Sequence, residues 1–394
     1  MAEDVEARIE AAVEERVEEA LEEERRTSYL ELFFDLVFVY AITQVTSLVL
    51  SDTSAAGFGR SLVVLLLLWW AWSAYAWMTN AIDIEDRLTR VLMFAGMAAA
   101  FMTAFAIPDA YEGEGVWFGA SLLAVLVVCI FLYLRGTRGD PELLRSVARL
   151  APFFLAGPIL VLVGGFFGDG VRDGLWIAAI VVTFAGALDA GGRTWRVSAS
   201  HFAERHGLFV IIALGESIIA IGIGAAEAHR DLALVGTMLV ALLGSFALWG
   251  AYFGYVAGAI ERALGGLRDP AERGRLARDV FTFLHLPMIA GIVLFAVAAK
   301  KAVGHPEDPL SGAGRFALAA GIGLMLLALA GGRWRVVRSI AWGRLLAAAA
   351  VIVAAAALTD LAAVGVLAVC VGILTLEVLY ETFRPTRPGR RAPG

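Results

Sequence analysis

Residues 201–224 read HFAERHGLFVIIALGESIIAIGIG, a polar start followed by an apolar segment that contains a single acid. The apolar part has the length of a membrane helix, and Glu216 falls near its middle. A carboxylate is costly in hydrocarbon, so such a residue normally faces protein or water and is a candidate for function. This stretch therefore predicts a membrane protein with an ionisable group near the centre of the bilayer.

The rest of the chain supports an all-α polytopic membrane protein. It has 394 residues, 59% of them hydrophobic, and a mean hydropathy of +0.76. Most of its apolar segments approach the roughly 20 residues that cross a bilayer. We predict 12 transmembrane helices, at 32–50, 61–79, 88–107, 115–134, 149–168, 174–190, 208–226, 232–259, 281–299, 315–331, 340–359 and 362–380.

The segment around Glu216 has a counterpart earlier in the chain. Residues 35–44 align without gaps on residues 207–216, so that Gln44 meets Glu216. Two further matches follow in the same order, 72–75 with 249–252 and 87–90 with 275–278. Such a series predicts a duplicated half, a common construction in transporters.

Basic residues predict the orientation of these helices. With a cytoplasmic N-terminus, 25 of the 32 Lys and Arg residues lie beside inside loops and 6 in outside loops. Both termini are then cytoplasmic, and the two six-helix repeats are parallel. We predict four regions: an acidic amphipathic helix at 1–26, membrane repeats at 27–200 and 201–383, and a basic tail at 384–394.

Polar residues of the predicted helices gather toward the cytoplasmic side, with Gln44 and Glu216 deepest. Such a pattern is typical of a polar vestibule that leads to a site near the midplane. The candidates for binding a substrate or a proton are Glu216, Asp35, Gln44, Glu31, Asn80, Glu204, His206 and His285.

Structural explanations compete with function at the first helix. Ser28 and Glu31 have the spacing of a capping box, so Glu31 is as consistent with a helix cap as with a site. Asp35 is harder to explain structurally, although an ion pair with Arg90 or another cytoplasmic arginine would do so. Glu216 is too deep for an interface role, which favours function.

Structural explanations also apply further along the chain. Glu204, Arg205 and His206 are consistent with ordinary residues of a helix start and the lipid headgroup region. His285 is consistent with a hydrogen bond between helices. Pro287 predicts a bend in the ninth helix, where the freed backbone groups need partners.

The second helix is rich in aromatic residues. Its aromatic side chains are Trp69, Trp70, Trp72, Tyr75 and Trp77. We expect mainly packing and interface anchoring from them, and a stacking role for some is the alternative.

Several chemistries have no signature in the chain. No phosphate-binding glycine loop, HExxH zinc motif or GxSxG elbow occurs, and the histidines are scattered. We therefore predict no catalytic residue, metal or cofactor. The arginines are explained by topology, so we expect the lipid bilayer as a partner and no nucleic acid.

The sequence resembles the bacterial low-temperature-requirement A family. The resemblance is carried by residues 31–39, ELFFDLVFV, and by residues 201–217, HFAERHGLFVIIALGES. Shorter matching pieces are 77–80, WMTN, and 284–287, LHLP. The resemblance implies a multi-pass protein of the bacterial inner membrane, and the motif positions coincide with the polar residues identified above.

Three functions are consistent with this sequence. The leading hypothesis is a secondary-transporter-like protein in which Glu216 and Asp35 carry charge or a proton, assisted by hydrogen bonds from Gln44, Asn80 and His285. The second is a membrane-embedded enzyme that acts on a lipid or isoprenoid through cytoplasmic-side acids and histidines. The third is a cold-stress scaffold or sensor whose polar residues only hold helices together. The sequence does not identify the solute, ion or lipid that the protein would bind. It does not give the oligomeric state either.

Overall fold

The protein is an all-α polytopic membrane protein. The computed structural model describes residues 26–84, 86–189, 195, 197–254 and 256–383. Within these residues 11 helices are long and apolar enough to cross a membrane, and α14 (Trp342–Ala357) is apolar but shorter. Each of the 12 predicted segments overlaps one of these helices. The predicted acidic helix and basic tail lie outside the described residues.

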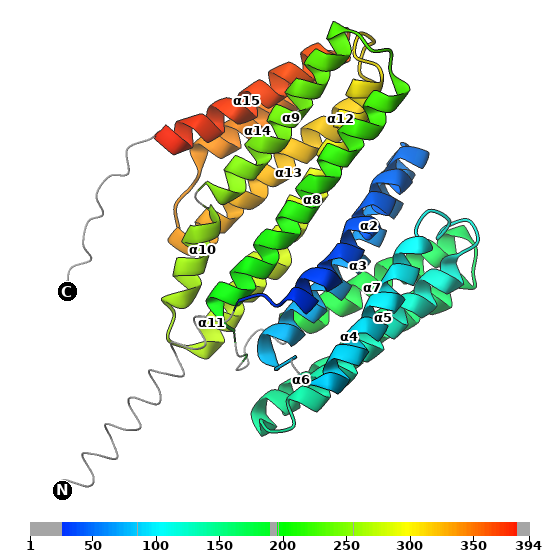
Figure 1. Cartoon of the computed structure of the whole chain (residues 1–394), viewed down its shortest axis with the longest axis vertical. Coiled ribbons are helices and arrows are strands. Elements are labelled where there is room, and N and C mark those ends of the chain that lie inside the picture. Colours follow the sequence, from blue (N-terminus) through cyan, green and yellow to red (C-terminus); the bar gives the residue numbers. More distant parts are fainter. Residues whose placement is uncertain (1–25, 85, 190–194, 196, 255, 384–394) are drawn as a thin grey trace, which may run out of the picture. The chain divides into compact units, whose positions relative to one another are not determined.

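The chain forms two compact units, drawn in Figure 1 with the helix labels used below. The first unit extends to Ala213 and also includes Ala259–Leu286, and the second comprises Leu214–Gly258 and the chain from Pro287 onward. Helix α8 (Ala199–Glu227) continues from the first into the second. The predicted duplication into two six-helix repeats stays a prediction.

The first unit is a bundle in which successive helices pack on one another. Helix α2 packs on both α3 and α4, α3 also packs on α5 and α7, and α4 to α7 pack in order along the chain. The helices that lie wholly in this unit are α2 (Tyr29–Ser51), α3 (Ala55–Ala81), α4 (Arg87–Phe105), α5 (Gly115–Gly136), α6 (Pro141–Gly165), α7 (Asp169–Asp189), α11 (Pro270–Ala277) and the π-helix η2 (Arg278–Leu284).

The second unit contains α9 (Leu232–Phe253), α13 (Gly312–Val337) and α15 (Ala363–Phe383), which pack together with α14. Most of α12 (His285–Gly304) also belongs to it. Helices α12 and α13 meet at glycines, since a Cβ on Gly291 would lie 2.6 Å from the carbonyl oxygen of Gly321. Arg344 of α14 pairs with Glu381 of α15 at 2.6 Å.

The predicted segment 232–259 lies within the apolar span Leu232–Gly265. The described residues of this span form α9, which ends at Phe253, and α10 (Val256–Gly265). Continuous apolar character runs through this region in the sequence, so hydropathy alone does not locate the end of the helix.

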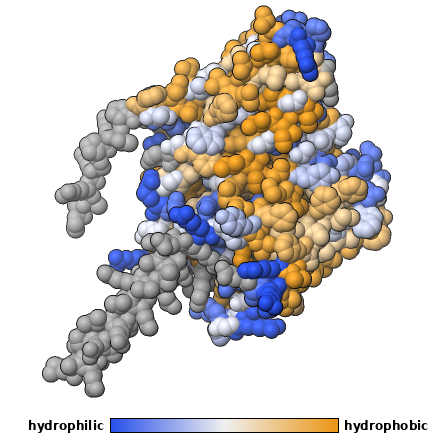
Figure 2. Space-filling model, in the orientation of Figure 1, coloured by the Kyte–Doolittle hydropathy of each residue, from blue (hydrophilic) through white to orange (hydrophobic). Residues whose placement is uncertain are grey.

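Side chains on the outside of the bundle are largely apolar, as a lipid environment requires. Figure 2 shows apolar residues over much of the visible surface and hydrophilic residues in separate patches. Helix α4, for example, exposes Phe94, Phe101 and Phe105. These exposed aromatic residues contact hydrocarbon in a membrane, so their exposure costs little there.

A polar contact fixes the start of α4 outside the apolar region. Asp86 caps the helix by accepting the backbone N–H groups of Leu88 and Thr89, and Arg135 of α5 donates to the same carboxylate at 2.9 Å. The hydrogen bond from Arg135 contributes most to holding the pKa of Asp86 below its usual value. The contact joins the cytoplasmic-facing ends of α4 and α5, as the predicted topology orients them.

Helices α5 and α6 approach so closely that only glycine fits between them. A Cβ on Gly119 would lie 2.4 Å from the Cα of Leu162, and a Cβ on Gly165 would lie 2.5 Å from the carbonyl carbon of Gly115. In a membrane, helix association depends on such close packing, because lipid tails are as apolar as leucine side chains. These glycines therefore set the distance between the two helices.

We predict that Gly119→Ala lowers the thermal stability of the detergent-solubilised protein, by an overpacking cost of about 1–3 kcal/mol. Gly236→Ala on α9 is the matched control, because nothing lies within 4 Å of its added Cβ. Size-exclusion chromatography after a temperature series measures both. Equal midpoints for the two variants would contradict the close crossing of α5 and α6.

Candidate functional site

The centre of the candidate site is a buried arginine between two carboxylates. Arg205 of α8 has no solvent exposure, and both carboxylates belong to α2. Its Nη1 donates to Oε1 of Glu31 at 2.8 Å, and its Nη2 donates to Oδ1 of Asp35 at 2.8 Å. The guanidinium therefore bridges two acids one helical turn apart.

Helical spacing explains why these side chains meet. Glu31 and Asp35 are four residues apart and share one face of α2, and His201 and Arg205 are four residues apart on α8. Two pairs with the same spacing thus face each other across a helix contact. His201 also contacts α2, since its Nε2 lies 3.1 Å from Oε1 of Glu31.

Glu31 is both a helix cap and a member of this cluster. Its carboxylate accepts the backbone N–H of Ser28 at 2.9 Å, while Ser28 Oγ accepts the N–H of Glu31 in a capping box. The same carboxylate binds Arg205 and His201. The capping box predicted at Ser28 and Glu31 is confirmed, and the same carboxylate is also a member of the buried cluster.

Asp35 is less completely paired than Glu31. Its Oδ1 accepts hydrogen bonds from Arg205 and from Nε1 of Trp72, each at 2.8 Å. Its Oδ2 is buried and has no hydrogen-bond partner, and the same is true of Nε of Arg205. Asp35 is 1% exposed, so this unpaired oxygen lies in a region of low dielectric.

Asn80 links the cluster to the chain before α8. Its Oδ1 accepts the backbone N–H of Ser198 at 3.1 Å, which fixes which end of the amide carries oxygen. Its Nδ2 then donates to the carbonyl of Ser198 and to Nδ1 of His201, the latter at 3.0 Å. His201 Nδ1 is therefore an acceptor, and the ring proton lies on Nε2, which donates to Glu31.

Two further histidines lie beside this cluster, and aromatic side chains pack around them. The ring centroid of His206 is 5.2 Å from that of His285 and 4.9 Å from that of Trp72, and both histidines are fully buried. Each Nδ1 hydrogen-bonds a backbone carbonyl, that of Phe202 for His206 and that of Val280 for His285. Nε2 of His206 has no hydrogen-bond partner.

A π-helix, η2, lies directly before α12, whose third residue is Pro287. In η2 the carbonyl of Thr282 accepts Nε1 of Trp69 at 2.8 Å. Turns of π-helix are frequent at functional sites. The bend predicted at Pro287 stays a prediction.

An apolar groove reaches the cluster from the side. It has a volume of about 370 Å³ and is lined by Asp35 together with side chains of α2 and α8, among them Phe33, Leu36 and Ile211. These three apolar side chains are exposed, so the groove opens toward the lipid-facing surface of this unit. Asp35 is thus the polar end of an otherwise apolar groove.

The structure brings only some of the sequence candidates together. Glu31, Asp35 and Asn80 belong to the cluster, and His206 and His285 lie beside it. Glu204 is exposed and accepts the backbone N–H of Thr27 at 2.8 Å. The remaining two candidates do not belong to the cluster. Gln44 is half-buried on α2, nine residues after Asp35. Glu216 belongs to the second unit and is 2% exposed.

The residues that hold the cluster together are not among the sequence candidates. His201 belongs to a matching motif only, and Arg205, expected at a helix start and the headgroup region, is fully buried instead. Arg90, named as a partner for Asp35, is exposed. The matching four-residue spacings of 31 and 35 and of 201 and 205 were the signal that would have found the pairing.

No group of three or more His, Cys, Asp and Glu side chains suited to a metal ion occurs in the described part of the chain. The cluster contains one arginine, one neutral histidine and two acids, and its contacts are those of charge pairing.

Fold and site together define a polytopic helical membrane protein with an ion-paired cluster buried among its helices. Residues 26–378 match the family model of bacterial low temperature requirement A protein (LtrA), and the chain belongs to this family. It is also 32% identical over 324 residues to "Uncharacterized protein RA0937" of Rhizobium meliloti (strain 1021), covering 79% of this chain and 77% of that protein. The resemblance drawn from the motifs is confirmed.

We predict that Arg205→Met strongly destabilises the protein, because it leaves two buried carboxylates without their counter-charge. Removal of one partner from a buried pair typically costs about 3–5 kcal/mol. Thermal unfolding in detergent, followed by tryptophan fluorescence, measures the effect.

Two further variants separate charge from packing. Arg90→Met removes an exposed arginine and should leave the midpoint unchanged. The triple variant Arg205→Met, Glu31→Gln, Asp35→Asn should recover part of the stability lost in Arg205→Met, because no charge is then left unpaired. An Arg205→Met protein as stable as Arg90→Met would show that the cluster contributes little.

Proposed function

We propose that the protein is a secondary-transporter-like membrane protein in which the Glu31–Asp35–Arg205 cluster takes up and releases a proton. The observation that supports this most directly is the charge of the cluster. His201 is neutral, because its Nδ1 accepts from Asn80. With both acids ionised, two negative charges face one positive charge.

A buried net charge is expensive. The cost of an unpaired ion within protein is several kcal/mol even after relaxation, so a compensating positive charge is favoured. A proton on one carboxyl group supplies it without any other ligand. Uptake of one proton makes the cluster neutral, and its release leaves a single negative charge that attracts a proton or another cation.

The hydrogen bonds indicate which acid holds the proton. Glu31 accepts from Ser28, His201 and Arg205, so its ionised form is well stabilised. Asp35 has a buried oxygen, Oδ2, without a partner. An added proton on Oδ2 disturbs none of the existing contacts, which makes Asp35 the proton-binding group of the proposal.

Proton exchange at Asp35 would change the link between α2 and α8. When Asp35 is ionised, Arg205 is shared between two carboxylates. When Asp35 is neutral, the attraction between Arg205 and Asp35 weakens and Glu31 remains the main counter-charge. A protonation step thereby alters how firmly two helices are joined, which is what coupling of proton binding to helix movement requires.

Glu216 enters the proposal as a second buried carboxyl group. It lies eleven residues after Arg205 on α8, about 16 Å along a continuous helix. Gln44, Asn80 and His285 remain proposed hydrogen-bonding groups for a solute or a proton path. The partner is a small solute, ion or lipid that the chemistry of the cluster does not by itself identify.

We also propose the inner membrane of a bacterium as the location, with both termini cytoplasmic. The support is the alternation of basic residues between successive loops. In this orientation the cluster lies toward the cytoplasmic ends of α2, α3 and α8.

The test is proton movement in proteoliposomes that contain an internal pH-sensitive dye, with candidate solutes added under an imposed membrane potential. Wild-type protein should give a solute-dependent proton signal. Asp35→Asn should abolish it, because the neutral amide cannot exchange a proton, while Asp35→Glu should retain part of it.

Glu204→Gln is the matched control, since Glu204 is an exposed acid of the same region and its loss should leave the signal intact. Glu216→Gln tests the second carboxyl group. If a correctly folded Asp35→Asn protein gave a proton signal as large as that of wild type, the assignment of the proton to Asp35 would be contradicted.

The groove at Asp35 favours a second candidate function, an enzyme acting on a lipid or isoprenoid. A long apolar chain would fit a groove of about 370 Å³ lined by α2 and α8, with its polar end at the carboxyl group. Lipid that co-purifies with wild type, and is lost when Leu36→Trp fills the groove, would favour this function over transport.

A further inference from the structure

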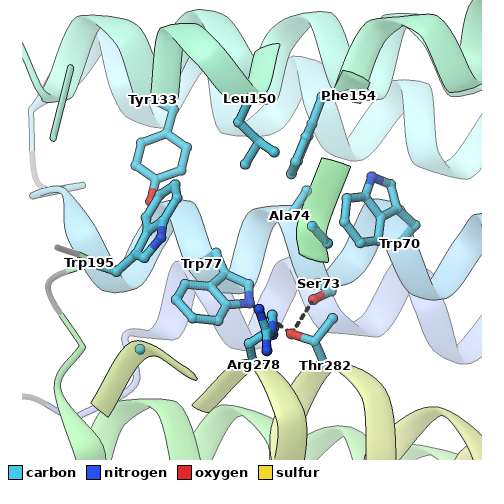
Figure 3. A pocket seen from close by; sticks show the side chains of 12 residues that line it. Trp70, Ser73, Ala74, Trp77, Tyr133, Leu150, Phe154, Trp195, Arg278 and Thr282 are labelled. Atoms are coloured by element: carbon cyan, nitrogen blue, oxygen red, sulfur yellow. Dashed lines mark hydrogen bonds between the residues drawn. The ribbon is translucent and has the colours of Figure 1, made fainter. Parts of the chain in front are cut away.

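A small cavity lies within the first unit and is lined by Trp70, Tyr133 and Thr282 among other residues (Figure 3). Its volume of about 50 Å³ suffices for a few water molecules, each of which needs roughly 10–15 Å³, and for no larger ligand. A better-defined binding surface belongs to the second unit, at the turn between α13 and α14.

This turn joins the ends of two apolar helices. Helix α13 is long and apolar enough to cross a membrane and ends at Val337, and α14 begins at Trp342. Trp334, Val337, Ile340 and Trp342 are all exposed, from 50% to 64%. Exposed tryptophans at the end of a membrane helix are typical of the level of the lipid headgroups. The turn is therefore expected where the phosphates of a bilayer lie.

The turn carries an excess of positive charge. Residues 331–344 contain four arginines and no acid. Arg344 is paired with Glu381, whereas Arg333 and Arg338 form no ion pair with any residue that the structure describes. The C-terminus of a helix supplies only about half a negative charge, which does not offset two guanidinium groups. A counter-charge for this turn has to come from outside the described chain.

Arg338 has a backbone conformation that arginine rarely adopts. Its φ of 52° and ψ of 32° are left-handed, and it is the one non-glycine residue with positive φ among the described residues. Helix ends of this kind usually carry glycine, because a Cβ is unfavourable there. An arginine that only oriented the helix in the membrane would act equally well at a neighbouring position. Its place in the turn therefore indicates a role for the side chain itself.

Contacts within the turn hold two guanidinium groups close to each other in the chain. Cζ of Arg338 lies 5.1 Å from the ring centroid of Trp334, over the face of the indole. Nε of Arg333 donates to Oγ of Ser339, the residue after Arg338, at 2.9 Å. Neither contact involves a carboxylate. Two like charges on one turn repel each other, and a bound anion removes this repulsion.

We propose that the turn between α13 and α14 binds the headgroup of an anionic phospholipid. The phosphate accepts hydrogen bonds from Arg333 and Arg338, and the acyl chains lie against the exposed side chains of Val337 and Ile340. These apolar neighbours favour a lipid over a soluble anion. The proposal does not depend on the proton cluster, whose residues belong to the first unit.

Phosphatidylglycerol and phosphatidylcholine are the probes, because both contain a phosphate and only the first has a net negative charge. Native mass spectrometry of the full chain in mild detergent, titrated with each lipid, measures the affinity for the first lipid bound. Phosphatidylglycerol should bind about tenfold or more tightly than phosphatidylcholine. Equal affinities would overturn the proposal, and so would displacement of phosphatidylglycerol by an equal concentration of inorganic phosphate.

Arg338→Gly removes the guanidinium and introduces the residue that the left-handed conformation favours. It should weaken the binding of phosphatidylglycerol by about fivefold, the effect of one arginine beside an anionic surface. Its thermal stability without anionic lipid should be equal to that of wild type or higher. Arg338→Lys keeps the charge and should retain most of the affinity. A less stable Arg338→Gly protein with unchanged affinity would show that Arg338 only ends the helix, and would contradict the proposal.

Arg230→Gly is the matched control, because Arg230 is an exposed arginine of the same unit, in the loop between α8 and α9. It removes the same charge and should leave the affinity for phosphatidylglycerol unchanged. If it weakened binding as much as Arg338→Gly, the affinity would reflect net charge alone, and the turn would not be a lipid site.

Discussion

The structure of the first unit depends on one fully buried guanidinium. Arg205 has no solvent exposure, yet it satisfies two carboxylates, Glu31 and Asp35, that would otherwise be isolated ions among apolar helices. A buried ion pair adds little stability compared with apolar packing, but a buried acid without its partner is strongly destabilising. The three residues therefore require one another, and they fix how α2 meets α8.

The neighbouring polar groups follow from the same constraint. A polar backbone or side-chain group that is not in contact with water must form its hydrogen bonds within the protein. Trp72 donates to Asp35, Asn80 sets the tautomer of His201, and Trp69 donates to the carbonyl of Thr282. Within the cluster, Oδ2 of Asp35 is left without a partner, and this atom carries the proton in the proposed function.

Hydropathy and spacing predicted much of the fold, because each transmembrane helix must be long and apolar whatever it packs against. They also placed Glu31, Asp35 and Asn80 among the candidates. They did not reveal Arg205, because the four-residue spacing of Glu31 and Asp35 and that of His201 and Arg205 indicate a pairing only once α2 and α8 are taken to face each other. The end of α9 at Phe253 has no signal in hydropathy for a related reason, since the apolar run continues past it.

In the proposed function the buried cluster carries one extra proton, and Asp35 holds it. Infrared difference spectroscopy of the protein at neutral pH, with exchange into D₂O, detects the carbonyl band of a protonated carboxyl group directly. We predict such a band in wild type and in Glu31→Gln, and its loss in Asp35→Asn. A wild-type spectrum identical to that of Asp35→Asn in this region would contradict the assignment of the proton to Asp35.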